Sequence, residues 1–449
     1  MDYSWKYLRS FNSSKNLAFE ELCCQLAACE ENVPKDSVFE RKGTPDAGVE
    51  CFWTLPNKDE WGWQAKFFLD IPNSTQWVEI DKSVKTALST HPKLQRYYVC
   101  LPLDKPDARK PNQKSFAKKW EERVNKWNKW TSSKKMKVQF IYWGNHQIFE
   151  RLSKDVHRGR RFFWFNEEYF SKEWFEEKLA EIFFYAGPRY TSELNIKLEI
   201  SKVFEGLGRT EFLYKEFEVL FGDIKIKFED INDKDVKLKF EEKYNELKKY
   251  IDSILAYKSE FLNPQINYYA FPTLNQKILT CSEFIWNLES LLDEYDRNNT
   301  SPDPNRREGI FSYTRHKLKK LNTSLAELKN FVESDCSVAS NYNNLLIVGK
   351  AGIGKTHLIC DIGRMRIEKN RPSVILLGEH FNDSDPFMQI IKFLDIKCDT
   401  FDEFLGALNS SAEANNTLGF IFIDALNEGD GKLIWKKYLP GLIKKSGAS

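Results

Sequence analysis

Two sets of residues have the types and spacing that phosphate chemistry needs. The first is the octapeptide at 349–356 (GKAGIGKT), which follows an apolar run at 345–348 and precedes a segment with a helical pattern. This pattern is typical of a loop that wraps around the phosphates of a nucleotide. Its glycines let backbone N–H groups face a polyphosphate, and the start of the next helix adds a positive dipole end.

The polar residues of this loop have expected roles. Lys355 reaches the β- and γ-phosphates, and Thr356 supplies an oxygen to Mg²⁺, so ATP and Mg²⁺ are the expected ligands. The residues expected to bind the nucleotide are Gly349, Gly352, Ile353, Gly354, Lys355, Thr356 and His357.

An apolar strand that ends in an acid should lie beside the loop, and residues 418–424 provide it. Asp424 is the expected carboxylate ligand of the Mg²⁺. Glu428 follows four residues later and is expected to orient or deprotonate the attacking water. About 20 residues remain after Glu428, and their pattern predicts a helix at 433–445.

The second set of residues lies near the N-terminus in an expected hairpin. Residues 17–30 have the pattern of a helix, and strands are expected at about 47–55 and 61–69. The five residues between the strands, 56–60, are typical of a hairpin turn. A further apolar strand is expected at 97–101.

This hairpin should bring four polar side chains together. Strand alternation places Asp46 and Glu50 on one face of the first strand. It likewise places Gln64 and Lys66 on one face of the second strand. With the turn near Lys58, Glu50 would fall opposite Lys66, and Asp46 would lie farther along the same edge.

Two carboxylates, a carboxamide oxygen and an ammonium group are the donors of a site for Mg²⁺ or Mn²⁺. Asp46 and the Gln64 carbonyl would bind the metal, with Glu50 as an alternative principal ligand. The metal acidifies a bound water, while Lys66 orients that water and offsets the charge that builds on the phosphorane. Such a site would cut phosphodiesters. The alternative is a solvated hairpin with ordinary surface charges.

The residues at 45–46 (Pro-Asp) and 64–66 (Gln-Ala-Lys) resemble the PD-(D/E)XK nuclease fold in its Mrr-like form, where Gln replaces the acid before x-Lys. The resemblance spans about residues 15–150 and is especially similar to the endonuclease effectors of bacterial anti-phage systems. It implies that Glu20 or Glu21, on the first helix, is an outer metal ligand.

The acidic strand and the residues after it, 420–428, resemble the STAND class of signal-transducing NTPases. That class usually carries a second acid where this chain has Asn427. With its regions in the order nuclease, helices and ATPase, the chain resembles the antiviral STAND NTPases of bacteria and archaea. Residues 186–195 and 206–210 are similar to the start of the connector in those proteins.

The resemblance implies a mechanism for the whole protein. A C-terminal sensor, not contained in this chain, would bind a viral protein as the trigger. ATP-bound subunits would then assemble as a homo-oligomer, a tetramer, and their clustered nuclease domains would cut double-stranded DNA without sequence preference. The chain is accordingly expected to be a piece of a longer protein that ends within its ATPase domain.

A basic stretch follows the expected hairpin. Residues 105–137 contain twelve Lys and Arg against three Asp and Glu. Lys118, Lys119 and Lys126 are expected to bind DNA phosphates, which would give affinity without sequence preference. The three tryptophans of this stretch are spaced for the buried face of a helix rather than for base stacking.

Length and pattern divide the chain into three regions. With 449 residues, the chain is long enough for about three domains. We expect an α/β multidomain protein with a PD-(D/E)XK (Mrr-like) nuclease domain at 1–155, a helical connector at 156–335 and the N-terminal part of a P-loop STAND NTPase sheet at 336–449. Two apolar stripes at helical spacing predict the core of a bundle in the connector: Tyr244, Leu247, Ile251 and Ile254, and Leu318, Leu321, Leu325, Leu328 and Val332.

Composition narrows the class of protein. A formal net charge of +2 gives no information on partners, so any nucleic-acid surface must be local. No apolar stretch approaches the roughly 20 residues of a membrane span, and the first residues lack the apolar core of a signal peptide. Nine cysteines without C-x-x-C pairs are typical of reduced thiols. We therefore expect a cytoplasmic protein without membrane contact.

Two other functions are consistent with these patterns. A nucleotide-dependent restriction endonuclease would use the P-loop domain to recognise or move along modified DNA. A non-enzymatic assembly scaffold would keep both sites as remnants. The short span between the loop and the acidic strand argues against a motor, and the presence of Lys355, Asp424 and Lys66 argues against a scaffold.

Overall fold

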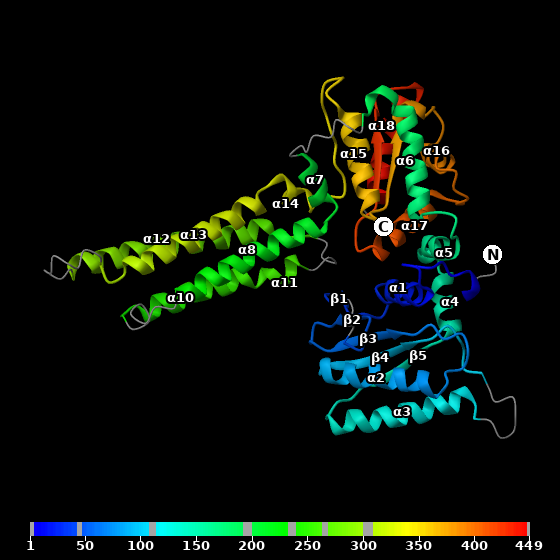
Figure 1. Ribbon diagram of the computed structural model, residues 1–449, viewed down its shortest axis with the longest axis horizontal. Coiled ribbons are helices and arrows are strands. Elements are labelled where there is room, and N and C mark those ends of the chain that lie inside the picture. The colour runs from blue at the N-terminus through cyan, green and yellow to red at the C-terminus, as the bar shows by residue number, and fades with distance from the viewer. Residues whose placement is uncertain are drawn as a thin grey trace. The chain divides into compact units, whose positions relative to one another are not determined.

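The computed structural model describes residues 4–42, 47–106, 114–191, 200–231, 239–262, 268–299 and 309–446. The chain forms two compact units: the first contains Met1–Tyr190 and Gly354–Ser449, and the second contains Thr191–Ile353. The first unit has mixed α/β structure with two sheets, and the second is helical (Figure 1). The expected α/β class is thus observed in its coarse form.

A five-stranded mixed sheet forms the N-terminal part of the first unit. Its order is β1-β2-β3-β4-β5, with antiparallel pairing from β1 to β3 and parallel pairing from β3 to β5. The strands are β1 (Val38–Arg41), β2 (Cys51–Thr54), β3 (Glu60–Ala65), β4 (Leu94–Cys100) and β5 (Gln139–Trp143). The hairpin strands are therefore present but shorter than expected.

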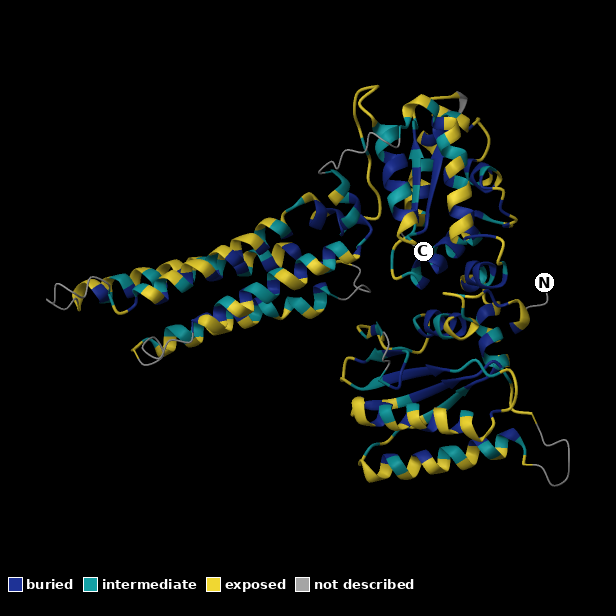
Figure 2. Ribbon diagram, in the orientation of Figure 1, coloured by how far each residue is buried: buried dark blue, intermediate teal, exposed yellow. Residues whose placement is uncertain are grey.

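Helices cover both faces of this sheet. α1 (Lys15–Ala27) lies on one face, and α2 (Ser74–Thr90) and α3 (Phe116–Ser133) lie on the other (Figure 1). The central strand β3 is buried along most of its length (Figure 2), as expected for a strand covered from both sides. Each of the three helices begins after a Ser or Asn whose side chain accepts a hydrogen bond from a backbone N–H of the first turn.

The core between the sheet and the α2–α3 layer is largely aromatic. Trp120 and Trp127 of α3 are buried there, and Trp130 is partly buried. Tyr97 of β4 and Phe116 are fully buried in the same core. The expectation that the tryptophans form the buried face of a helix is therefore confirmed.

The C-terminal part of the first unit has a second, smaller sheet. It consists of two parallel strands, β6 (Ser373–Leu377) and β7 (Phe420–Asp424). The elements around it are α15 (Lys355–Glu368), η4 (Gly378–His380), α16 (Pro386–Phe393), α17 (Phe401–Ala414), η5 (Asp430–Leu433) and α18 (Ile434–Ser446). The expected acidic strand and final helix are present as β7 and α18.

Helices that precede the bundle also belong to the first unit. They are α4 (Asn145–Ser153), α5 (Arg158–Phe165) and α6 (Lys172–Ala186), with 3-10 turns η1 (Trp5–Tyr7), η2 (Asp155–His157) and η3 (Gly187–Arg189). α6 packs on α15 and β6, and α5 packs on α17. The expected connector at 156–335 therefore differs from the observed division, because helical periodicity identifies an apolar face but not its partner.

α5 and α17 approach each other through two glycines. A Cβ atom placed on Gly159 would lie 2.3 Å from the carbonyl carbon of Gly406, and one placed on Gly406 would lie 3.1 Å from the Gly159 Cα atom. The missing side chains let the two helix backbones come close together.

A strand normally precedes a phosphate loop of this kind, but the apolar run at 345–348 does not form one. Residues 344–350 have no helical or strand structure, and Val348 is 83 % exposed. A parallel strand needs a hydrogen-bonded neighbour, and in the described part of the C-terminal sheet β7 pairs only with β6. An apolar run alone was therefore insufficient to predict the strand.

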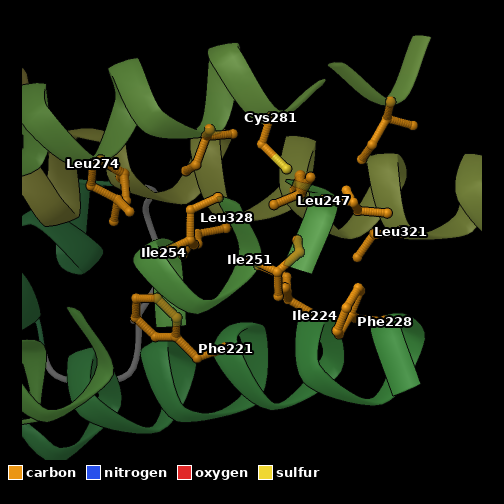
Figure 3. Close-up of a cluster of buried hydrophobic side chains, with 14 of the residues drawn as sticks. Phe221, Ile224, Phe228, Leu247, Ile251, Ile254, Leu274, Cys281, Leu321 and Leu328 are labelled. Atoms are coloured by element: carbon orange, nitrogen blue, oxygen red, sulfur yellow. The ribbon is translucent and has the colours of Figure 1, made fainter. Parts of the chain in front are cut away.

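The second unit is a helical bundle. Its helices are α7 (Ile200–Leu207), α8 (Glu211–Asp230), α10 (Glu241–Leu255), α11 (Tyr257–Phe261), α12 (Phe271–Asn298), α13 (Ser312–Val332) and α14 (Asp335–Ala339). Ile251, Leu321 and Leu328 meet in its core (Figure 3). Both predicted stripes are buried there apart from the half-buried Tyr244, so the bundle-core prediction is confirmed. Among all described helices, none is long and apolar enough to cross a membrane.

Candidate nuclease and nucleotide sites

Three of the expected nuclease residues lie where β3 ends. Gln64 is the next-to-last residue of β3 and is fully buried. Lys66 follows the strand, and its backbone N–H donates to the Cys100 carbonyl at 3.0 Å, which continues the pairing with β4. Glu50 immediately precedes β2, and its N–H donates to the Trp63 carbonyl at 2.8 Å. These backbone hydrogen bonds thus fix the positions from which the Lys66 and Glu50 side chains extend.

The hairpin register differs from the expected one by two residues. Trp63 is the partner of Cys51. Glu50, which precedes Cys51 and donates its N–H to the Trp63 carbonyl, therefore does not lie opposite Lys66. The turn is centred one residue earlier than expected, and its fourth residue, Lys58, has a positive φ of 70°.

The side chains of these residues nevertheless meet. Gln64 Nε2 donates to Glu50 Oε1 at 2.5 Å. Lys66 Nζ lies 3.7 Å from the same Glu50 oxygen, 4.0 Å from Glu20 Oε1 and 3.7 Å from Glu79 Oε1. One ammonium group is therefore surrounded by three carboxylates and a carboxamide, at the edge between α1, α2 and the end of β3.

The two acids of α1 have different surroundings. Glu20 faces Lys66, whereas Glu21 accepts hydrogen bonds from Arg41 and Gln25. Glu20 is therefore the candidate outer ligand. The sequence motifs do not indicate Glu79. The only sequence feature that could have indicated it is its place in the second turn of the helix that follows the Gln-Ala-Lys strand.

A divalent cation fits the donors of this site. Gln64 Oε1 is buried and has no hydrogen-bond partner among the described residues, although the Nε2 atom of the same amide is bonded to Glu50. A buried oxygen without a partner is costly, and a hard cation would satisfy it. Within the described residues, no three His, Cys, Asp or Glu side chains are grouped so as to hold a metal by themselves. Asp46, the other expected ligand, lies outside the described residues.

The candidate DNA-binding lysines on α3 are not equivalent. Lys118 is exposed and Lys119 is half-buried. The Lys126 ammonium donates to Asp81 Oδ2 at 2.7 Å, and Asp81 also accepts from Arg123 and from Trp127. Lys126 therefore has a structural partner on α2, and a sequence count of basic residues could not reveal this pairing.

The phosphate-loop motif has the expected form at its helical end. Gly352 and Gly354 have φ angles of 80° and 91°, which favour glycine, and α15 begins directly after them at Lys355. Thr356 Oγ1 donates to Asp424 Oδ2 at 2.5 Å, so the two expected Mg²⁺ ligands of the nucleotide site are adjacent. This pairing and the glycine conformations fit a Mg²⁺–nucleotide ligand, while the preceding strand is missing.

Glu428 and His357, two further predicted residues of the nucleotide site, lie in the first unit near the edge of the sheet where β7 ends. Glu428 is exposed, and its N–H donates to the Ala425 carbonyl in the turn after β7. The His357 ring lies 5.2 Å from the ring of Tyr190. Gly349 and Ile353 are exposed, as are Leu346 and Val348 before them.

Arg189 is a residue near this edge that the motifs did not indicate. Its guanidinium donates to Glu379 at 2.6 Å, and this hydrogen bond raises the pKa of Arg189, with Glu428 and Asp424 contributing in the same direction. Arg189 in turn lowers the pKa of the Glu379 carboxyl. Arg189 thus places a positive charge close to the carboxylates of Glu379, Glu428 and Asp424.

All nine cysteines are free thiols, as expected from their spacing. Burial raises the pKa of Cys23 well above its usual value, and a hydrogen bond with Cys51 together with burial does the same for Cys24. Thiols held in the neutral form are poor nucleophiles, so these residues serve the interface between α1 and the sheet.

The comparisons with known proteins add no family to this description. No protein-family model, no curated protein and no solved structure matches the chain.

Proposed function

We propose that this protein is an anti-phage defence protein in which ATP-dependent assembly activates a Mg²⁺-dependent endonuclease. Its substrate would be double-stranded DNA, cut without sequence preference. The observation that carries the nuclease part is the cluster of Glu50, Gln64 and Lys66, with one buried Gln64 oxygen that lacks a partner in the described structure. The resemblance to antiviral STAND NTPases supplies the biological setting.

The residues of the cluster have distinct roles in this proposal. Gln64 Oε1 and Glu50 would hold a Mg²⁺ ion, with Asp46 as a further ligand and Glu20 as an outer one. The metal would supply an acidified water and charge stabilisation at the phosphate. Lys66 would orient the attacking water and offset the negative charge of the transition state. Lys66 lies within 4.0 Å of three carboxylates, and this position supports the role proposed for it.

The nucleotide part of the proposal is supported by the Thr356–Asp424 pair. Lys355 would contact the β- and γ-phosphates, Thr356 and Asp424 would hold Mg²⁺, and Glu428 would orient the water for hydrolysis. In this proposal the bound nucleotide favours assembly into a homo-oligomer, a tetramer, which brings nuclease sites together. A viral protein would trigger assembly through a sensor outside this chain.

The direct test of the nuclease is a lysine substitution. Lys66→Ala should abolish Mg²⁺- or Mn²⁺-dependent nicking of supercoiled plasmid, because the side chain that orients the water is lost. The fold should be kept, since Lys66 contributes a charge just after the end of β3 rather than core volume. Lys93→Ala is the matched control, because Lys93 is an exposed lysine that precedes β4.

Metal binding provides a second readout for the same site. Gln64→Ala should weaken Mn²⁺ binding by about 10-fold or more, as removal of metal-site partners usually does. Undiminished nicking by Lys66→Ala, at wild-type metal affinity, would show that the cluster is not a nuclease site.

A further inference from the structure

Four charged side chains of low exposure meet between the two sheets of the first unit. We call Glu21, Arg41, Arg160 and Glu413 the charge junction. They come from four different elements, α1, β1, α5 and α17. Their side chains are 14 %, 16 %, 10 % and 28 % exposed, respectively. Charges buried to this degree need partners.

The charge junction is continuous through hydrogen bonds. Arg41 Nη1 donates to Glu21 Oε1 at 2.5 Å and to the backbone carbonyl of Glu413 at 3.3 Å. Arg160 Nη2 donates to the two carboxylate oxygens of Glu413 at 3.2 and 3.3 Å. Burial raises the pKa of the Glu21 carboxyl, and Arg41 opposes this effect. Arg41 thus joins α1 to α17 directly.

A neutral side chain strengthens the same connection. Gln25 is fully buried, and its Nε2 atom donates to Glu21 Oε1 and to the Ser410 carbonyl, each at 3.0 Å. Its Oε1 atom accepts from Trp164 Nε1 at 3.0 Å. Both polar ends of Gln25 are therefore used to tie α1 to α5 and α17.

The charge junction lies between the two candidate sites along the chain. Glu21 follows Glu20, whose carboxylate lies 4.0 Å from Lys66 Nζ. On the other side, α17 leads through residues 415–419 to β7, which ends at Asp424. One arginine of low exposure, Arg41, therefore contacts the helix that carries Glu20 and the helix that leads to Asp424.

The path from α17 to the nucleotide site is also held by specific bonds. Thr417 N–H donates to the Ala412 carbonyl at 3.0 Å, which closes the end of α17. Arg366 Nη2 donates to the Leu418 carbonyl at 2.5 Å. Arg366 lies on α15, the helix that begins with Lys355 and Thr356. A shift of α15 would therefore be transmitted to the short segment that joins α17 to β7.

A buried ion pair is poor evidence for stability, because apolar replacements of the same size are often as stable. A role in positioning accounts for the charge junction better. We propose that Arg41 is a positioning residue that couples the two candidate sites: it holds α1, and with it Glu20, in register with α17. A nucleotide bound at Thr356 and Asp424 is then sensed at Lys66.

The coupling rests on the proposed function, since it needs nucleotide binding at α15. The coupling can be measured directly by hydrogen–deuterium exchange of the full chain with and without ATP and Mg²⁺. In the wild type, ATP should slow exchange at the start of α15 and also within α1, by about 5-fold or more, the lower end of usual coupling factors.

The critical variant removes both charges of the central pair. Glu21→Gln with Arg41→Met avoids leaving a buried charge without a partner, which would endanger the fold. ATP should still slow exchange at α15 in this variant, but exchange in α1 should no longer respond. Arg41→Lys is the second variant. In this variant a single ammonium group replaces the planar guanidinium group, so the response of α1 should be reduced rather than lost.

A neighbouring ion pair on the same strand provides the control. Glu40 and Lys42 flank Arg41, their charged atoms are 3.9 Å apart and both side chains are exposed. Glu40→Gln with Lys42→Met removes the same number of charges without touching α17. This variant should respond to ATP as the wild type does.

The outcomes separate the coupling from the proposed function. Slowing at α15 without slowing at α1 in the wild type would overturn the coupling and leave nucleotide binding intact. A full α1 response in the Glu21→Gln, Arg41→Met variant would overturn the role of Arg41. If ATP slows exchange nowhere in the wild type, nucleotide binding fails, and the coupling fails with it.

Discussion

At the scale of single residues, the surroundings of Lys66 are acidic. Three carboxylates lie within 4.0 Å of its ammonium group. Like charges gathered at one point repel unless a cation compensates for them. In the proposed nuclease site, a bound divalent ion would add positive charge beside these carboxylates.

Sequence alternation could predict which residues share this site but not how they contact one another. Glu50, Gln64 and Lys66 were identified from strand periodicity and from the family resemblance. The two-residue shift in register depends on the conformation of the turn, which alternation does not encode. Glu79 belongs to a helix that reaches the site only through the tertiary packing of α2 on the sheet.

His157 makes the stability of the first unit depend on pH. Burial lowers the pKa of His157 to about 4, and the adjacent Arg160 adds to this effect. The unfolded chain binds the proton below a pKa of about 6.5, so protons favour unfolding as the pH falls from 6.5 toward 4. Between pH 7 and pH 5 the folded state should lose about 1–2 kcal/mol from this group.

The measurement is urea unfolding at these two pH values, with His157→Gln as the comparison. The variant should lose less stability than the wild type over this interval, because its side chain does not titrate. An equal loss in both proteins would show that His157 is not held neutral.

At the scale of elements, the close crossing of α5 and α17 reverses a usual rule. Alanine normally stabilises a helix interior relative to glycine, by up to about 1 kcal/mol. At Gly159 the added Cβ would lie 2.3 Å from a backbone carbon of α17. Gly159→Ala should therefore destabilise the first unit, by about 1–3 kcal/mol, as overpacking usually does.

Gly222 provides the matched control for this crossing. It lies within α8, and a Cβ atom placed there meets nothing within 4 Å among the described residues. Gly222→Ala should thus stabilise the bundle slightly. Thermal unfolding of both variants tests the prediction through opposite signs, and stabilisation by both would mean that the α5–α17 contact is looser than described.

The DNA-binding prediction also belongs to an element, the outer face of α3. Lys118→Glu with Lys119→Glu should weaken binding to all duplexes alike and flatten the dependence of log affinity on log salt, because phosphate contacts are lost. Lys126 is omitted because its reversal would also break the pairing with Asp81. Lys248→Glu with Lys249→Glu, on α10, is the charge-matched control.

Fluorescence anisotropy with two unrelated duplexes at several salt concentrations measures this effect. A loss confined to one DNA sequence would contradict simple phosphate contacts. A similar loss in the α10 control would attribute the effect to net charge rather than to α3.

At the scale of the whole molecule, the sequence could predict the parts better than their association. Both motifs and the bundle stripes were visible in the sequence. It could not show that α5 packs on α17 or that α6 packs on α15 and β6, because an amphipathic helix does not specify its partner. Nor could it show that the expected strand at 345–348 would remain outside the described sheet, since pairing depends on a neighbouring strand.

The role of nucleotide can be separated into switch and motor by two variants of the full chain. Lys355→Ala should lose nucleotide binding and, with it, DNA cleavage, although the nuclease residues are untouched. Glu428→Gln keeps Lys355, Thr356 and Asp424, so it should bind ATP and assemble while hydrolysis falls. Cleavage by this variant should persist or last longer.

Plasmid cutting and phosphate release, measured side by side, test the distinction. A motor requires turnover, so it would lose cleavage in both variants. Equal loss in both would therefore favour the restriction-type function over the switch.

The first compact unit is built from two separate stretches of the chain. The helical bundle is an insertion: the first unit is interrupted after Tyr190 and resumes at Gly354. The two cut points are near each other, because the Tyr190 ring lies 5.2 Å from that of His357, three residues beyond Gly354. The returning connection contains the phosphate-loop motif, whose first five residues belong to the inserted unit and whose last three belong to its host. The phosphate-loop motif therefore marks the point at which the chain returns from the inserted unit to its host.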